Sequence, residues 1–533
     1  MSDGKRFSRR EFLKSSTAAG VGAAVGMGVC AGGSLTASPR VLRAENGTGA
    51  MIYFFDDEPI RKMEGLSRIP GPVEKLGPVL EPTSSDGDMC ASFASSVVEL
   101  DDRRWRLYYT FANRAAGRQG IGVAESQDGL HWARPLLGQV KRDGKDTNQL
   151  FIEGLPDDAA RSFHGQPQVL RLPDGSWLMY FWVHGGYLRY SIARSEDGLH
   201  WRVDDFDRPA VYHPHELNPH GFTMGFTPED LAGHKRFGGL SATELLRLKA
   251  LRSNDATYVY YNADLRRFEM YSVWLMFNPE DGPRSVSYDN APQALRTIHR
   301  RLSGDGVSWS DPELIITPDD ADPMDQQFYY LAVHWQDGWH IGMLGNYPVA
   351  DQTMDVELCF SRDGRQWSRP IRTPWLPRGP EKHDSLMVYA PNRLIDAGEH
   401  WLLLYTGSNH LHNASRPEGS HKPRSVTCAA RFPKRRFLGL RAQGSGQLWT
   451  RPFIPKKREI RLDAAISGQV RAELCDPYGT PLPGLSRVEA VPLTGDSTEH
   501  VLRWKDGNSA RYQYDAVSLR LAIADATVYA IEA

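Results

Sequence analysis

One short pattern, Ser-x-Asp-Gly-x-x-Trp, recurs four times in the sequence and constrains the fold more than any other feature. The copies begin at Ser126, Ser195, Ser303 and Ser361, so their starts lie 69, 108 and 58 residues apart. Asp-Gly favours a tight turn because glycine accepts a positive φ and the aspartate carboxylate accepts hydrogen bonds from the nearby backbone. A turn repeated at such long intervals indicates a large structural unit that carries insertions.

Two alternating, strand-like runs precede each copy of the turn. The runs are 95–100 and 105–110, 167–172 and 177–182, 257–262 and 268–274, and 328–334 and 339–344. A fifth unit has runs at 392–395, 400–406, 425–430 and 436–438, where the turn pattern has decayed. Five such units predict an all-β chain whose body is a five-bladed β-propeller. A β-sandwich array and a six-bladed propeller are the alternatives.

The repeated turn is absent beyond Leu440. Short strand-like runs at 460–462, 470–475, 501–504 and 517–523 predict a separate C-terminal β-sandwich. The expected division is therefore a propeller over 46–440 and a sandwich over 441–533. Ser241 and Glu244 form a capping signal, which predicts a helix over 241–250 inside the third unit.

The N-terminus carries Arg9 and Arg10, followed by a small, uncharged, Ala/Gly-rich run over 17–37. This arrangement resembles a bacterial twin-arginine signal, and the run is too weakly apolar for a stable membrane helix. We expect residues 1–45 to be a signal peptide read by the twin-arginine translocase. The mature chain is then expected in the periplasm or outside the cell, free of the membrane.

Composition excludes some partners and leaves others open. The formal net charge is −2, which gives no electrostatic case for nucleic acid or an anionic membrane. The 14 tryptophans and 21 tyrosines suit both β-structure and surfaces that stack on sugars. Four cysteines remain after residue 45, widely spaced, so we expect no obligatory disulfide framework.

The repeat and the expected sandwich support a family resemblance over about residues 50–533. The sequence resembles the five-bladed propeller glycoside hydrolases, the superfamily of family 32 and family 43 enzymes, and it looks closest to secreted bacterial proteins of the family-32 kind. The resemblance implies a carbohydrate substrate and no cofactor. It also implies that acids on the innermost strands meet in an axial pocket.

Aligning the inner strand of each unit by its distance in sequence from the second strand suggests where those acids lie. The third unit offers Asp255 and the fourth Asp325, whereas the second has Gln166 and the first only Ala94. The first-unit acid expected from the resemblance is therefore missing from its place. The invertase-type Trp-x-Asn-Asp-Pro-Asn and Arg-Asp-Pro motifs are missing as well.

Two further acids lie six residues before the aligned positions, Asp88 in the first unit and Asp384 in the fifth. Glycoside hydrolysis needs one protonated and one ionised carboxyl group, and clustered carboxylates raise one another's pKa. The expected catalytic set is Asp88, Asp255, Asp325 and Asp384. The expected substrate-binding residues, placed beside these acids, are His164, Gln166, Glu381 and His383.

Other readings of the sequence are weaker. His213, His215, Glu216 and His220 form a Pro-containing loop without metal-ligand spacing, so no metal site is predicted. The Arg-Ile-Pro at Arg68 is similar to that of sialidases, whose other active-site residues cannot be placed here. Two functions remain, a secreted glycosidase and, because of the missing first-unit acid, a carbohydrate-binding propeller without activity.

Overall fold

The computed structural model describes residues 51–83, 89–101, 104–113, 118–161, 163–184, 188–212, 252–277, 286, 288–289, 294–380, 383–413 and 424–533. Within these residues the chain is almost entirely β-structure, and its helical elements are α2 (Asp157–Arg161) and the 3-10 helix η3 (Ser509–Tyr512). The predicted signal at 1–45, the helix at 241–250 and the histidine-containing loop at 213–220 lie outside the described residues.

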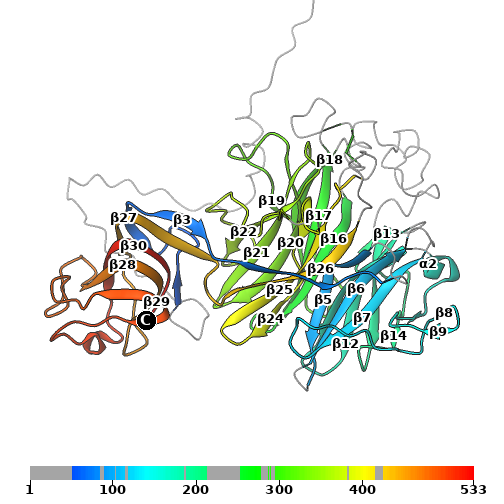
Figure 1. Ribbon diagram of the computed structural model, residues 1–533, viewed down its shortest axis with the longest axis horizontal. Coiled ribbons are helices and arrows are strands. Elements are labelled where there is room, and N and C mark those ends of the chain that lie inside the picture. The colour runs from blue at the N-terminus through cyan, green and yellow to red at the C-terminus, as the bar shows by residue number, and fades with distance from the viewer. Residues whose placement is uncertain are drawn as a thin grey trace, which may run out of the picture. The chain divides into compact units, whose positions relative to one another are not determined.

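The strands form five consecutive blades, so the predicted propeller is confirmed (Figure 1). The first blade is β5 (Met89–Glu99), β6 (Trp105–Asn113) and β7 (Arg118–Ser126). The second is β11 (Phe163–Arg171), β12 (Trp177–His184) and β13 (Leu188–Ser195), with the short strands β10 (Ile152–Glu153), β14 (Trp201–Arg202) and β15 (Val211–Tyr212). In the sequence, a small hairpin of β8 (Lys141–Arg142) and β9 (Lys145–Asp146) comes between these two blades.

The remaining three blades follow in chain order. The third is β16 (Arg252–Asn262), β17 (Arg267–Phe277), β18 (Ala294–Ser303) and β19 (Glu313–Ile316), and the fourth is β20 (Gln326–Gln336), β21 (Trp339–Pro348) and β22 (Asp355–Ser361). The fifth contains β23 (Met387–Tyr389), β24 (Leu394–Ala397), β25 (His400–Ser408) and β26 (Ser425–Pro433). The inner strands β5, β11, β16 and β20 contact their neighbours around the propeller axis.

The repeated turn is stabilised by the hydrogen bonds that its residue types predict. In the second copy, Ser195 Oγ accepts from the backbone N of Gly198 at 2.9 Å, and Asp197 Oδ1 accepts from the backbone N of His200 at 2.8 Å. Trp201 Nε1 donates to the Gly198 carbonyl at 3.1 Å. Gly198 has a φ of +73°, a conformation that side chains with a Cβ rarely adopt.

The turn also joins neighbouring blades. The buried hydroxyl of Tyr108, in the first blade, donates to the carbonyl oxygen of Gly198 in the second blade at 2.6 Å. Tyr180 of the second blade donates to Gly306 of the third in the same way, also at 2.6 Å. The pattern that reveals the repeat therefore closes its own hairpin, and it also joins the second blade to the first and the third blade to the second.

An N-terminal strand completes the last blade. β4 (Glu74–Leu80) pairs with β26 and supplies the outer strand of the fifth blade. The sequence assigned that position to 436–438, but these residues lead into the C-terminal sheet instead, and Leu438 is the first residue of β27. The prediction was wrong because the true partner lies at the opposite end of the chain, where no local pattern points to it.

The C-terminal module is one seven-stranded sheet. Its strands are β1 (Met51–Tyr53), β2 (Ile60–Glu64), β3 (Ser67–Pro70), β27 (Leu438–Thr450), β28 (Arg461–Cys475), β29 (Leu493–Val501) and β30 (Ser518–Glu532). Residues 51–70 therefore belong to this module, and the propeller begins at β4 rather than at residue 46. The long strands bend at bulges, as between Ala442 and Ser445, and all seven strands are hydrogen-bonded into one sheet. Its predicted division into the two layers of a sandwich stays a prediction.

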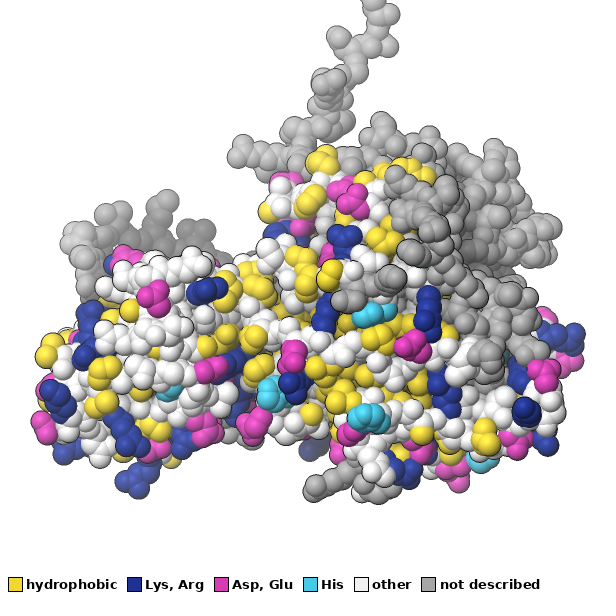
Figure 2. Space-filling view, viewed as in Figure 1, with side chains coloured by type: hydrophobic (Ala, Val, Ile, Leu, Met, Phe, Trp, Pro, Cys, Tyr) yellow, Lys and Arg dark blue, Asp and Glu magenta, His cyan; other side chains and the backbone are white. Residues whose placement is uncertain are grey.

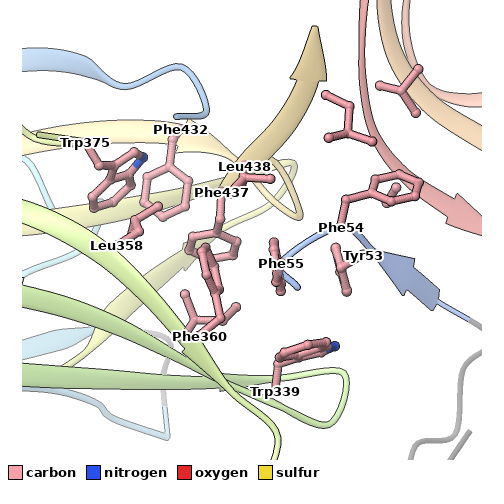
Figure 3. Close-up of a cluster of buried hydrophobic side chains, with 14 of the residues drawn as sticks. Tyr53, Phe54, Phe55, Trp339, Leu358, Phe360, Trp375, Phe432, Phe437 and Leu438 are labelled. Carbon is pink, nitrogen blue, oxygen red and sulfur yellow. The ribbon is translucent and has the colours of Figure 1, made fainter. Parts of the chain in front are cut away.

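Aromatic side chains pack the N-terminal segment against the fourth blade (Figure 3). The fully buried Phe55 ring stacks on Phe360 at a centroid distance of 4.0 Å and on Tyr53 at 4.6 Å. The Trp339 ring meets Phe55 edge-on at 5.2 Å, and the Tyr53 hydroxyl donates to Asp337 at 2.6 Å. One continuous apolar core thus runs from the fourth and fifth blades into the C-terminal sheet.

The described surface shows no strong charge bias. Acidic and basic side chains are interspersed over the face in Figure 2, in keeping with the net charge of −2. In the described part of the chain, no helix is long and apolar enough to cross a membrane. The thiols of Cys359, Cys428 and Cys475 are buried and free of disulfide bonds.

Candidate active site

Bulges in the inner strands bring two of the predicted site residues together at the propeller axis. β11 has a bulge between Gly165 and Gln168, and Gln166 within it has a φ of +53°. β16 has a bulge between Ser253 and Thr257 that contains Asp255. A bulge redirects side chains that a regular strand would alternate between its faces.

The side chains of Gln166 and Asp255 are in direct contact. Gln166 Nε2 donates to Asp255 Oδ2 at 3.2 Å. The Tyr190 hydroxyl bonds the carbonyl oxygen of Asp255 and lies 2.9 Å from Gln166 Oε1. Thr110 Oγ1 accepts from the backbone N of Gln166 at 2.7 Å. Gln166 of the second blade, which is itself held by Thr110 of the first, therefore positions the Asp255 carboxylate of the third blade.

Three buried tyrosines feel the charge of Asp255. Burial, and then the negative charge of Asp255, raise the pKa values of Tyr190 and Tyr329 well above the usual range, and the pKa of Tyr389 is raised by the same two causes. The Tyr329 and Tyr389 rings lie 6.3 Å apart, and each side chain is at least nine-tenths buried. At neutral pH these hydroxyls stay protonated, and each has a hydrogen-bond partner within the protein: the Asp255 carbonyl for Tyr190, His412 for Tyr329 and, at 3.0 Å, Met387 Sδ for Tyr389.

A buried ion pair lies beside Tyr329. Arg296 and Asp289 are joined at 2.9 Å, and the Tyr347 hydroxyl donates to Asp289 Oδ1 at 2.9 Å. His412 Nε2 lies 2.7 Å from the Tyr329 hydroxyl. Burial and the charge of Arg296 lower the pKa of His412 to about 3, so at neutral pH its uncharged ring can accept the Tyr329 proton in a hydrogen bond.

Asp289 itself is committed to this ion pair. Burial acts to raise its pKa, but the charge of Arg296 and the hydrogen bonds that the carboxylate accepts hold the pKa well below the usual range. Gln352 Nε2 also donates to Asp289, at 3.2 Å. The carboxylate is therefore ionised, and it is engaged by Arg296, Tyr347 and Gln352, which suits a structural role beside Tyr329.

Asp325 lies outside the bulge of its own strand. The bulge in β20 falls between Phe328 and Leu331 and contains Tyr329, so Tyr329 occupies the place that Asp255 and Gln166 have in their strands. Asp325 precedes β20, and its Oδ2 accepts from the backbone N of Ala350 at 3.3 Å. The bulge of β20 thus lies farther along the strand than the sequence alignment of the units predicted. The catalytic role of Asp325 stays a prediction.

Asp384 takes part in a buried ion pair of the fifth blade. Its Oδ2 accepts from Lys75 Nζ at 2.7 Å and from the Tyr405 hydroxyl at 3.0 Å. The Asp384 side chain is fully buried, and that of Lys75 is 25% exposed. His383 Nε2 lies 3.9 Å from Asp384 Oδ1. These contacts join β4 to the residues ahead of β23, which is a structural role for Asp384.

The other predicted residues are placed less completely. His164 is half-buried at the start of β11, beside Gly120 of the first blade. Asp88 and Glu381 lie outside the described residues. In the first blade, the bulge between Ala91 and Ser96 contains Ala94, so no carboxylate stands there. Among the residues that the structure describes, no group of His, Cys, Asp and Glu is arranged to bind a metal ion.

No known protein-family model matches the chain, and no curated protein matches it in sequence. Solved structures of similar fold include a glycosyl hydrolase from Bacteroides ovatus, at 11% identity, covering 68% of this chain and 94% of the other, with a TM-score of 0.42.

Two other similar structures have related descriptions. An N-acetylgalactosamine deacetylase from F. plautii in complex with blood group B trisaccharide has 15% identity, covers 70% of this chain and 97% of the other, and has a TM-score of 0.42. A thermostable family-43 glycoside hydrolase has 15% identity, covers 64% and 88%, and has a TM-score of 0.39. Propeller glycoside hydrolases are thus among the proteins to which this chain is similar, and the site assignments rest on the contacts given above.

Proposed function

We propose that this chain is a glycoside hydrolase that binds a poly- or oligosaccharide at the axial end of the propeller marked by Asp255. The observation that carries the proposal is the Asp255 carboxylate, held by Gln166 Nε2 at 3.2 Å. A carboxylate held in place by an amide donor suits both the binding of sugar hydroxyls and proton transfer at a glycosidic oxygen.

Hydrolysis needs a second carboxyl group. Asp325, just ahead of β20, and Asp88, which lies outside the described residues and precedes β5 in the sequence, are the candidates. Asp384 is the weaker candidate, since Lys75 and Tyr405 already engage its Oδ2. We therefore assign Asp255 one catalytic role and seek the other in Asp325 or Asp88.

The second candidate function is carbohydrate binding without cleavage. Ala94 in the first-blade bulge favours it, because the acid expected there is absent. Asp255, Gln166 and the tyrosines would then only hold the sugar.

Turnover and binding assays separate the two functions. The purified protein is incubated with aryl glycosides and with plant and algal polysaccharides, and released sugars are quantified by chromatography. We expect Asp255→Asn to lower turnover about 10²- to 10⁴-fold, and Asp311→Asn, which alters an exposed aspartate of the same blade, to leave it unchanged. Unchanged turnover in Asp255→Asn would refute the catalytic assignment. Binding of a glycan that is never cleaved would establish the second function.

We also propose export through the twin-arginine pathway, which rests on Arg9, Arg10 and the weakly apolar run that follows. Replacing both arginines by lysine should retain the full-length chain in the cytoplasm. Cell fractionation and immunoblotting measure this, and normal export of the double variant would contradict the proposal.

A further inference from the structure

A second hollow lies at the opposite end of the inner strands. It has a volume of about 660 Å³ and is lined by the last residues of β5, β11, β16 and β20 and by the link between β23 and β24. Ligand pockets usually measure about 300–1,000 Å³. The lining residues nearest in sequence to Gln166 and Asp255 are Val169 and Tyr260, which lie three and five residues farther along β11 and β16, or about 10 and 17 Å of strand. The hollow is therefore separate from the candidate active site.

Asn392, a residue of the hollow's wall, has an unused acceptor that is buried beneath the surface of the hollow. Its Nδ2 donates to Ser96 Oγ at 3.2 Å and to the carbonyl oxygen of Val259 at 2.9 Å, which fixes the amide in place. The side chain is only 6% exposed, and its Oδ1 accepts no hydrogen bond within the described part of the chain. A buried acceptor of this kind is costly unless a ligand or water donates to it.

Arg393 and Glu99 add charged groups to the wall. Both side chains are accessible to solvent, yet desolvation by the surrounding protein lowers the pKa of Arg393, and the charge of Glu99 opposes this effect. Neither side chain makes a hydrogen bond or an ion pair with another described residue. The hollow thus offers guanidinium donors and carboxylate acceptors that the fold does not use.

Aromatic rings complete the lining. Trp335 is half-exposed, and its Nε1 donates to Asp264 Oδ2 at 2.7 Å, which fixes the orientation of the indole. Tyr261 is also half-exposed and packs against Phe268 with the ring centroids 4.9 Å apart. Rigid aromatic rings beside hydrogen-bonding groups suit a ligand that has both apolar C–H faces and hydroxyl groups.

The charged side chains in the wall of the hollow favour some polar ligands over others. Asp101 and Arg171, also in the wall, neutralise each other through two hydrogen bonds of 2.6 and 2.9 Å. The charges left over are those of Arg393 and Glu99, which are opposite in sign. An anion drawn to Arg393 would also face Glu99, so an uncharged ligand is favoured.

We propose that this hollow is a second saccharide-binding site that takes a neutral sugar unit. Arg393 donates to sugar hydroxyls and Glu99 accepts from them. Trp335 or Tyr261 lies against a C–H face of the sugar. The site binds without cleaving, and it operates whether or not the Asp255 site hydrolyses its ligand.

The test uses the folded full chain, labelled with a fluorophore and applied to a microarray of neutral and uronate-containing plant, algal and bacterial glycans. Affinity electrophoresis with each glycan bound on the array then gives dissociation constants. The variants are Arg393→Ala and Glu99→Gln, with Asp255→Asn reporting on the active site. Arg487→Ala, at an exposed arginine of the C-terminal module, is the matched control.

We expect to find a neutral glycan that still binds the Asp255→Asn variant. Its affinity for Arg393→Ala should be about tenfold or more lower, because a hydrogen bond to a charged group is lost. Glu99→Gln preserves side-chain shape and should weaken the same binding even if Arg393→Ala folds poorly, which thermal denaturation detects. Binding of uronate glycans alone, binding lost only in Asp255→Asn, or the absence of any glycan that depends on Arg393 or Glu99 would each overturn the proposal. Hydrolysis that requires Asp255 is a separate result and does not bear on it.

Discussion

Replacing Lys75 by methionine removes the cation that faces Asp384 in the fifth blade. Asp384 is fully buried, and Oδ2 would keep only the Tyr405 hydroxyl, at 3.0 Å. Breaking a buried ion pair by removing one partner costs about 3–5 kcal/mol, because the remaining charge has lost its compensation. Lys75 is 25% exposed, so some solvent reaches the pair, and we expect the lower end of that range, about 3 kcal/mol.

For a cooperative unit the size of the propeller, a loss of this size lowers the unfolding midpoint by about 4 °C. Urea denaturation followed by tryptophan fluorescence, with calorimetry alongside, measures both quantities. The double variant Lys75→Met, Asp384→Asn removes both charges and should recover most of the lost stability. A Lys75→Met protein within about 0.5 kcal/mol of wild type, or a double variant no more stable than the single one, would refute this reasoning. Turnover by folded Asp384→Asn shows whether this aspartate is also catalytic.

Three further predictions concern the scaffold. Tyr108→Phe removes the 2.6 Å bond to the Gly198 carbonyl, which keeps the Trp201 Nε1 donor, and should cost about 0.5–1.5 kcal/mol in urea denaturation. Phe55→Ala removes a fully buried ring stacked on Phe360 and should cost about 3–5 kcal/mol, measured in the same way. Burial lowers the pKa of His334 to about 4, below the usual 6.5, so the unfolded chain takes up a proton first and stability falls as the pH drops from 6.5 to 4. His334→Leu should flatten that fall by up to about 1.4 kcal/mol per pH unit, and an unchanged pH slope would contradict the assignment.

The sequence predicted the blades well because the features that identify them are local. Ser195, Asp197 and Gly198 make their hydrogen bonds within a few residues of one another, so the turn and the strands flanking it follow from the sequence pattern. The outer strand of the fifth blade could not be found in this way. β4 pairs with β26, and the side chains of Lys75 and Asp384 meet across 309 positions of sequence.

The candidate site was predicted in part. Gln166 and Asp255 were placed correctly relative to each other because each lies in the bulge of its inner strand. The same alignment failed for Asp325, since the bulge of β20 lies farther along the strand and contains Tyr329. The pair formed by Arg296 and Asp289 gave no local signal, because burial and pairing depend on the assembled blades.

The pairing of the strands in residues 51–80 has consequences for how the chain folds during synthesis and for where it can be truncated. β1 pairs with β30, so that Met51 lies opposite Glu532, and β4 pairs with β26. The blades span one stretch of chain from β4 to β26, whereas the C-terminal sheet combines strands from both sides of that stretch. A growing polypeptide must therefore reach β26 before the ring can close and β30 before the sheet can close. Closing such long loops is entropically costly and slows folding. A fragment ending near Leu440 would expose β1, β2 and β3 as unpaired edges prone to aggregation.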